Sequence, residues 1–235
     1  MALPKLTRPE YSTRLPSTGK KIKYHPFTVR EEKILMLAAE GQDPEEIVNA
    51  VTNVLERCVS TPQDFKVKDL ALFDIEFLFL KARSKSVGEV IEVKVPDPED
   101  PDTSVDVSIN IDRIGVKKDK NHTNIIDLSD EIKVSMRYPD ISFFSTGVDT
   151  SNITASLDVV AKCIKQIIND EEVFDSSDLG EEELAEWLQD LSQEQFKKIM
   201  NFFETTPKLS HTINATNPNT GREFSVTLEG LADFF

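Results

Sequence analysis

The stretch that sets the fold class is residues 72–111, LFDIEFLFLKARSKSVGEVIEVKVPDPEDPDTSVDVSINI. At its start, about 70–85, apolar residues lie on nearly every side of a helix, which predicts a helix buried on more than one face. From Val87 the apolar period changes to two, which predicts strands over 90–95 and 105–111. The Pro- and Asp-rich residues between them form a loop. The stretch therefore predicts a buried helix followed by an antiparallel hairpin.

The residues before this stretch predict a hairpin and two capped helices. Residues 10–24 alternate in polarity on both sides of a Pro-Ser-Thr-Gly turn. Thr28 and Glu31 have the spacing of a capping box, which places a helix start at Thr28. Asp43 followed by Pro44 is typical of a second helix start.

The residues after the stretch mix short strands with helices. We expect strands near 113–118, 123–128 and 131–137, a loop over 139–151, helices over 152–169, about 181–190 and from Ser192 onward, and a last hairpin from 210–215 and 222–228. The expected fold class is α+β, with short antiparallel β-hairpins and segregated helices. A division into two subdomains is placed near residue 150, giving 1–150 and 151–235.

The middle and terminal hairpins, 93–111 and 212–228, resemble one another. Each has a strand, a knuckle and a Val-rich returning strand, and such knuckles in other proteins often hold two Cys pairs around zinc. The knuckles here offer Asp97, Glu99, Asp100 and Asp102, or Asn217, Asn219 and Thr220, and no sulfur. We expect no zinc. Calcium at the 97–102 loop stays as an alternative, although this loop lacks the glycine and the twelve-residue spacing of an EF-hand. Without a metal, the hairpins must be stabilised by docking on helices or on another subunit.

Composition restricts the classes of partner. The chain has 235 residues, a formal net charge of −15 and a hydrophobic content of 39%. An acidic chain is repelled by phosphate backbones and by anionic lipid, so we expect neither nucleic acid nor membrane as a partner. No apolar run in the sequence is long enough to span a membrane, and we expect no secretory signal. The two cysteines, Cys58 and Cys163, lie in predicted helices, and a single pair cannot be a disulfide framework. This use of cysteine is typical of a protein of a reducing cytosol.

Catalytic motifs are not found in the sequence. His25, His122 and His211 are far apart, and there is no nucleophile elbow, zinc-protease motif or glycine-rich phosphate loop. Cys58 and Cys163 are interpreted as core residues, and the acids at 181–183 as a solvated helix start. We therefore expect no enzyme activity, no catalytic residues, no cofactor and no metal. A hydrolase of undetected type stays as an alternative.

Charge is unevenly distributed along the chain. Residues 1–33 carry eight basic side chains against three acids, whereas residues 170–194 carry eleven acids and no Lys or Arg. The acidic run is interpreted as a solvated surface. The alternative is that one end of the chain attracts the other, within one chain or between neighbours.

The last eight residues hold four large apolar groups, Leu228, Leu231, Phe234 and Phe235. Burial of each would contribute about 1.5–3 kcal/mol, so they must dock on the body of the protein or in the groove of a partner. We predict partner contacts at these four residues and at the N-terminal hairpin. The predicted hairpin contacts are Tyr11, Leu15, Ile22 and Tyr24.

These segments together resemble the baseplate hub assembly proteins of T4-like bacteriophages over nearly the whole chain. The matching blocks are Leu3-Pro4-Lys5-Leu6 with Pro9-x-Tyr11, Leu15-Pro16-Ser17-Thr18-Gly19-Lys20, Tyr24-His25-Pro26-Phe27, 29–35, 73–80, 83–89, Pro218-Asn219-Thr220-Gly221 and 228–235. The block over 73–80 and 83–89 is the most specific. Some relatives carry Cys pairs at the knuckles, and this chain has none.

The resemblance implies a hub subunit or assembly factor that works through protein contacts. Its partners would be other baseplate hub or tape-measure proteins, with self-association as a further alternative. It would work in the cytoplasm of the infected bacterium, and either stay in the tail baseplate of the virion or leave as a chaperone. From another class, the acidic run suggests a regulator that masks the basic surface of a nucleic-acid-binding protein.

Overall fold

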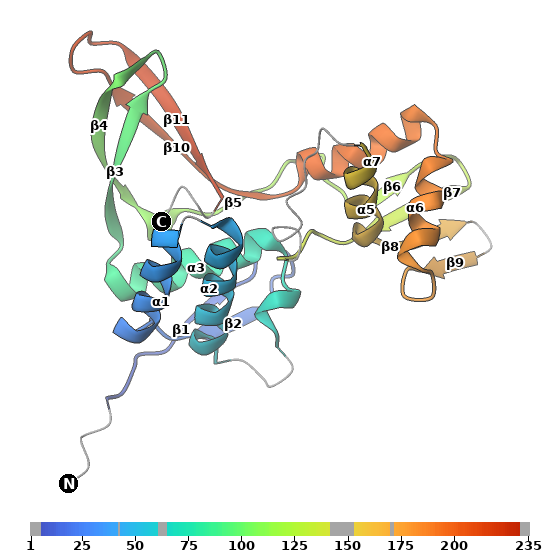
Figure 1. The fold of residues 1–235 in the computed structure, drawn as a ribbon, viewed down its shortest axis with the longest axis horizontal. Helices are drawn as coiled ribbons and strands as arrows, with labels where there is room; N and C mark the ends of the chain where they lie inside the picture. Colours follow the sequence, from blue (N-terminus) through green and yellow to red (C-terminus); the bar gives the residue numbers. More distant parts are fainter. Residues whose placement is uncertain (1–5, 42, 61–64, 142–152, 170–171, 231–235) are drawn as a thin grey trace. The chain divides into compact units, whose positions relative to one another are not determined.

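The structure is a computed structural model that describes residues 6–41, 43–60, 65–141, 153–169 and 172–230. The described residues form six helices and eleven strands, and the strands make small antiparallel sheets, which confirms the α+β class (Figure 1). The chain divides into two compact units. Unit 1 comprises residues 1–117 and 208–235, and unit 2 comprises residues 118–207. In the described parts of the chain, no helix has the length and apolarity needed to cross a bilayer.

Unit 1 contains three helices, which begin where the sequence predicts. They are α1 (Val29–Gly41), α2 (Pro44–Cys58) and α3 (Leu72–Val87), with short 3-10 turns at Val67–Asp69 and Ile111–Arg113. At the start of α1, the Thr28 N–H donates to the Glu31 carboxylate at 2.9 Å. At the start of α2, the Asp43 carboxylate accepts from the Glu45 N–H at 2.9 Å. Each contact satisfies a backbone N–H group at the N-terminus of its helix.

Helix α3 forms the centre of this unit, because it is buried on more than one face. Phe79 and Leu80 are fully buried, and Phe27 stacks on Phe79 with the ring centroids 6.5 Å apart. Against α3 packs the hairpin of β1 (Tyr11–Arg14) and β2 (Lys21–Tyr24). The buried carboxylate of Asp74 on α3 accepts from the Ser17 N–H in the hairpin turn at 3.0 Å, which fixes the turn on the helix.

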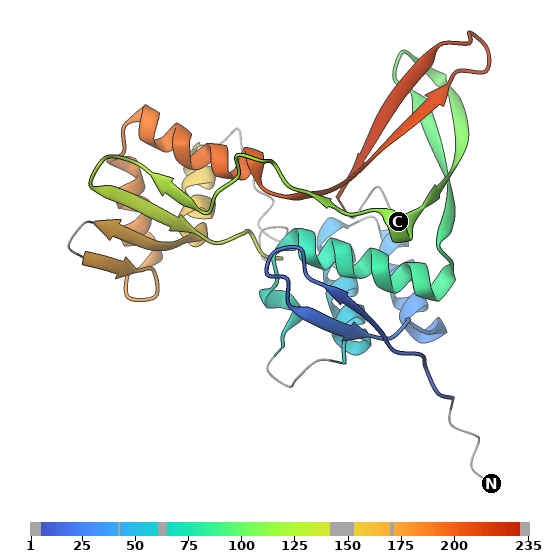
Figure 2. The same cartoon turned by 180° about the vertical axis from the view of Figure 1, so that it is seen from behind.

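Four further strands of unit 1 build two hairpins that run side by side away from the helices (Figure 2). The strands are β3 (Val90–Asp97), β4 (Asp100–Asn110), β10 (Lys208–Thr216) and β11 (Glu223–Glu229), with β5 (Val116–Lys117) pairing along the base of β10. We call β3, β4, β10 and β11 together the arm. The hairpins were expected to dock on helices or on another subunit. They pack on each other and, at the base, on Leu80 and Phe77 of helix α3.

Unit 2 is a four-stranded antiparallel sheet with three helices. The strands are β6 (Ile125–Asp127), β7 (Ile132–Met136), β8 (Ile164–Asn169) and β9 (Glu172–Asp175), in that order, and the helices are α5 (Ile153–Cys163), α6 (Glu181–Gln189) and α7 (Gln193–Thr205). Val134, Ile164, Ile199 and Phe202 lie at the centre of their common core. A capping box at Ser192 starts α7, as the sequence predicts.

The expected helix over 152–169 is wrong beyond Cys163, where β8 begins. Ser135 pairs with Gln166 and Met136 with Ile164, so Lys165 is an extra residue in the ladder. This bulge places Ile164 and Ile167 on one buried face although they are three residues apart. A spacing of three is also the helical spacing, which explains the error.

The units also differ from the expected division near residue 150. The chain leaves unit 1 after Lys117 and returns to it at Lys208. These two residues are direct antiparallel partners between β5 and β10. Unit 2 is therefore an insertion between two neighbouring strands of unit 1.

Candidate functional site

The arm has an apolar interior and a polar exterior, as the two-residue period of its strands requires. Its interior is formed by Val95, Ile109, Leu209 and Ile213, which are buried, and by half-buried residues that include Phe224. The outward side chains are exposed and are mostly Ser, Thr, Asn, Lys, Asp and Glu. Two ribbons that are each too thin to be stable alone thus share one hydrophobic layer.

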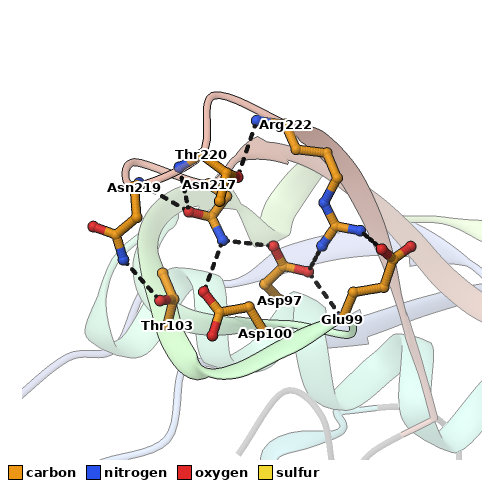
Figure 3. A network of polar contacts seen from close by, with 8 residues as sticks. All are labelled: Asp97, Glu99, Asp100, Thr103, Asn217, Asn219, Thr220 and Arg222. Atoms are coloured by element: carbon orange, nitrogen blue, oxygen red, sulfur yellow. Dashed lines mark hydrogen bonds and ion pairs between the residues drawn. The ribbon is translucent and has the colours of Figure 1, made fainter.

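The loops at the end of the arm are joined by a polar network around Asn217 (Figure 3). We call the side chains of Asp97, Glu99, Asp100, Thr103, Asn217, Asn219, Thr220 and Arg222 the tip network. The Asn217 amide donates to Asp97 at 2.8 Å and to Asp100 at 3.2 Å. Its carbonyl oxygen accepts from the backbone N–H groups of Asn219 at 2.9 Å and Thr220 at 3.1 Å. One amide therefore holds its own turn and the turn of the other hairpin.

Arg222 completes the network from the other side of the same turn. Its guanidinium forms ion pairs with Asp97 and Glu99 (Figure 3). The side chain of Asp97 is fully buried, and burial by itself raises the pKa of this carboxyl group. The hydrogen bonds from Asn217, Arg222 and the Glu99 N–H outweigh burial and lower the pKa of Asp97 to about 2. Asp97 is thus held as a carboxylate.

The carboxylates of the first knuckle are therefore bonded to side chains of the second knuckle. No group of three or more His, Cys, Asp or Glu side chains suited to a metal ion occurs among the described residues. What the arrangement does chemically is join two turns that lie 120 residues apart in sequence. The sequence signal for this contact was one cation, Arg222, in the second knuckle and several acids in the first.

Several strands of the arm have an edge without a sheet partner in the described structure. In the described structure β3 and β4 pair only with each other, and β11 pairs only with β10. Each of these strands therefore has one edge whose backbone groups have no ladder partner in the described sheets. Such edges can take up a further strand, and the polar side chains beside them are suited to a wet protein interface.

A family described as T4 bacteriophage base plate protein matches residues 8–235. The chain belongs to this family. It is therefore a phage baseplate protein, and the expected resemblance to T4-like baseplate proteins is confirmed. No curated protein and no solved structure matches the chain.

In this baseplate protein, three of the residues predicted to contact partners lie in the core of their own chain. Leu15, Ile22 and Tyr24 are 2%, 0% and 4% exposed. The alternation that suggested a surface hairpin instead directs these side chains toward the core of unit 1. The structure therefore gives no support to them as contact residues. Tyr11 is 36% exposed and lies beside Tyr24, with the ring centroids 5.9 Å apart.

The predicted C-terminal contacts of the baseplate protein have different outcomes. Leu228 is half-buried and packs against the interior of the arm, so this side chain belongs to the core of its own unit. Leu231, Phe234 and Phe235 lie outside the described residues. Contact of these three with a partner stays a prediction.

The histidines and cysteines of the baseplate protein lie at separate places. His25 contacts the Pro9 carbonyl oxygen through Nδ1 at 2.9 Å, and His211 lies on β10. His122 is in contact with the hydroxyl groups of Thr205 at 3.0 Å and Tyr138 at 3.1 Å. Burial lowers the pKa of His122. Cys58 and Cys163 are both buried thiols, as expected of core residues.

Proposed function

We propose that this baseplate protein is a hub assembly factor or hub subunit that acts through protein–protein contacts and changes no covalent bond. Family membership supports the baseplate as its place of action. The arm supports contact as its mode of action, because it offers open strand edges on a support fixed at both ends. Its partners are other hub or tape-measure proteins.

The arm is suited to this role because its geometry is fixed before a partner binds. The base is held by Leu80, Ile111 and Leu209, each fully buried. The tip is held by Asn217 and Arg222 through bonds to Asp97. A preorganised surface loses less conformational entropy on association than a flexible loop does, which raises affinity for a given contact area.

The experiment is complementation of a phage that lacks this protein, with plasmid-borne variants. A double substitution, Thr212→Lys with Thr227→Lys, places two cations on the outward face of the β10–β11 ribbon, where the two hydroxyl groups are 3.2 Å apart. We expect loss of assembled baseplates, counted by electron microscopy, with normal circular dichroism of the purified variant. The matched control is Lys94→Glu, an exposed residue of the other ribbon. Full assembly with both variants would contradict a role for the β10–β11 face.

Two truncations test the predicted contact of the last residues. A chain that ends at Gly230 keeps Leu228 packed in the arm, whereas a chain that ends at Thr227 removes it. If the last five residues bind a partner, the chain that ends at Gly230 folds but does not support assembly. Normal hub formation with that product would refute the contact. Mass spectrometry of purified particles then shows whether the protein stays in the virion tail or leaves after acting in the host cytoplasm.

A second candidate function is favoured by the exposed acids of α6, Glu181, Glu182, Glu183 and Glu186. These carboxylates could mask a basic nucleic-acid-binding surface of another protein. Binding to a basic partner that is lost when the four are changed to Gln, together with normal baseplate assembly by the same variant, would favour this function over the hub role.

A further inference from the structure

Unit 2 contains an apolar groove between its sheet and α6, with a volume of about 260 Å³. We call it the Trp187 groove. Its walls are Ile132 and Ile167 from the sheet, Phe174 from β9, Leu179 from the following turn, and Trp187 from α6. Phe174 is 41% exposed although its ring lines an apolar wall. Burial of this exposed aromatic ring under a partner side chain would lower the free energy of the complex.

The charged residue in the lining of the Trp187 groove is an acid. Glu183 lines the groove itself, and Glu182 and Glu186 are exposed on the same helix. The surrounding residues 170–194 contain no Lys or Arg. The groove therefore selects an apolar anchor flanked by cations, because a flanking acid would be repelled.

The chain itself contains a segment of this chemistry. Residues 3–9, Leu-Pro-Lys-Leu-Thr-Arg-Pro, carry two leucines and two cations and no acid. The chain is anchored from Pro9 onward, where His25 contacts the Pro9 carbonyl oxygen and Glu10 pairs with Lys23 at 2.7 Å. Ahead of that anchor Leu6 is 91% exposed. In the described structure, Leu6 and the Phe174 wall of the groove are therefore both largely exposed.

Backbone geometry favours the same pairing. Prolines at positions 4 and 9 disfavour a helix and favour an extended segment. β9 lies at the edge of the four-stranded sheet and pairs only with β8 in the described structure, so an extended segment can lie along it. An extended chain beside β9 would place a side chain next to Phe174.

We infer that the Trp187 groove of one copy binds residues 3–9 of a second copy, with Leu6 in the groove and the cations Lys5 and Arg8 facing Glu183 and its neighbours. Each copy supplies one segment and one groove. The contact therefore joins copies head to tail, or two copies exchange segments reciprocally. This self-association does not depend on the hub role proposed above.

The test uses the full chain and its only tryptophan, Trp187. Sedimentation velocity is measured at increasing protein concentration, and tryptophan emission is recorded in parallel. We expect larger species to appear together with a blue shift of the emission, since Leu6 excludes water from the indole. A synthetic peptide of residues 2–10, added in excess, should disperse the larger species and keep the blue shift. A chain that stays monomeric at every concentration would overturn the proposal.

Variants separate this contact from other kinds of association. Leu6→Asp should weaken association about tenfold or more without affecting the fold, because the side chain is 91% exposed. Val29→Asp is the matched control, because this apolar residue is 80% exposed in the same unit. Equal effects of the two substitutions would refute the assignment. A blue-shifted emission that is independent of concentration and lost in Leu6→Asp would show that the segment binds its own chain, and would likewise overturn the proposal.

A charge exchange tests the role of Glu183. The single variant Glu183→Arg should weaken association about tenfold. The double variant Lys5→Glu/Arg8→Glu should weaken it by about the same factor. Combining all three substitutions in one chain should restore association to near the original strength. Absence of rescue would mean that the cations of the segment do not meet Glu183, and would contradict the proposed orientation.

Discussion

Substituting the buried Asn217 by Ala should destabilise the arm. The amide of Asn217 is 1% exposed and makes four hydrogen bonds, two to the carboxylates of Asp97 and Asp100 and two to backbone N–H groups. A hydrogen bond to a charged group is worth about 1.5–3 kcal/mol, and one between neutral groups about 0.5–1.5 kcal/mol. Water can replace the contacts at the exposed residues of the turn, and Arg222 still pairs with Asp97. We therefore expect a loss of about 3 kcal/mol.

The assay is hydrogen exchange of the amides in β3 and β10, together with urea unfolding followed by circular dichroism. About 3 kcal/mol corresponds to exchange that is roughly a hundredfold faster wherever the arm opens as a unit. Asn219→Ala is the control, because its side chain makes one exposed hydrogen bond, to Thr103 at 3.0 Å. A loss below about 1 kcal/mol for Asn217→Ala, or a loss equal to that of the control, would refute the view that this amide joins the two hairpins.

Three further predictions follow from burial and charge. The pKa of Asp97 is about 2, against an ordinary value of 3.8. The contribution of this carboxylate to arm stability is therefore complete above about pH 4 and is lost as the pH falls toward 2. In acid unfolding, the Asp97→Asn variant should not show this loss of stability between about pH 4 and pH 2. Burial raises the pKa of the Cys58 thiol to about 11 and that of Cys163 further, so both should react with iodoacetamide at pH 8 at least about tenfold more slowly in the folded protein than in urea. Phe202→Ala should destabilise unit 2 by about 3–5 kcal/mol in urea unfolding, because the ring is 2% exposed and packs against three other rings; a loss under about 1 kcal/mol would contradict its place in the core.

Local chemistry explains which elements could be predicted from the sequence. The helix starts at Thr28, Asp43 and Ser192 could be predicted from their capping side chains. A capping side chain bonds to groups within three residues of itself, so its pattern is visible in the local sequence. The arm strands were predicted from alternating Val and Ile residues, because this alternation is also a local pattern. In each case the interaction that decides the structure is close in sequence.

Prediction failed where contacts distant in sequence decide the structure. The bulge at Lys165 gives β8 the apolar spacing of a helix, and only its pairing with β7 distinguishes the two. The boundary between the units depends on Lys117 meeting Lys208 across a ladder, which no local pattern indicates. The strand β9 lies in an acidic run that has little apolar alternation, so it was not predicted.

The candidate site shows the same limit. Both knuckles were identified as related, but nothing local showed that Asn217 and Arg222 would face Asp97. The alternation of Leu15, Ile22 and Tyr24 correctly indicated a hairpin, but one sequence does not show which face of a hairpin meets its own core. The burial of these three side chains within unit 1 decided that question.

The insertion of unit 2 between β5 and β10 also sets an order of events on the ribosome. The chain emerges from its N-terminus, so β3 and β4 are made well before the strands that cover their apolar side. All of residues 118–207 leave the exit tunnel in between and can fold first. Until β11 is synthesised, Val95 and Ile109 lie open to chaperones or to other nascent chains. The interior of the arm therefore closes only after β10 and β11 have left the tunnel, and a product terminated before β10 leaves the apolar faces of β3 and β4 uncovered.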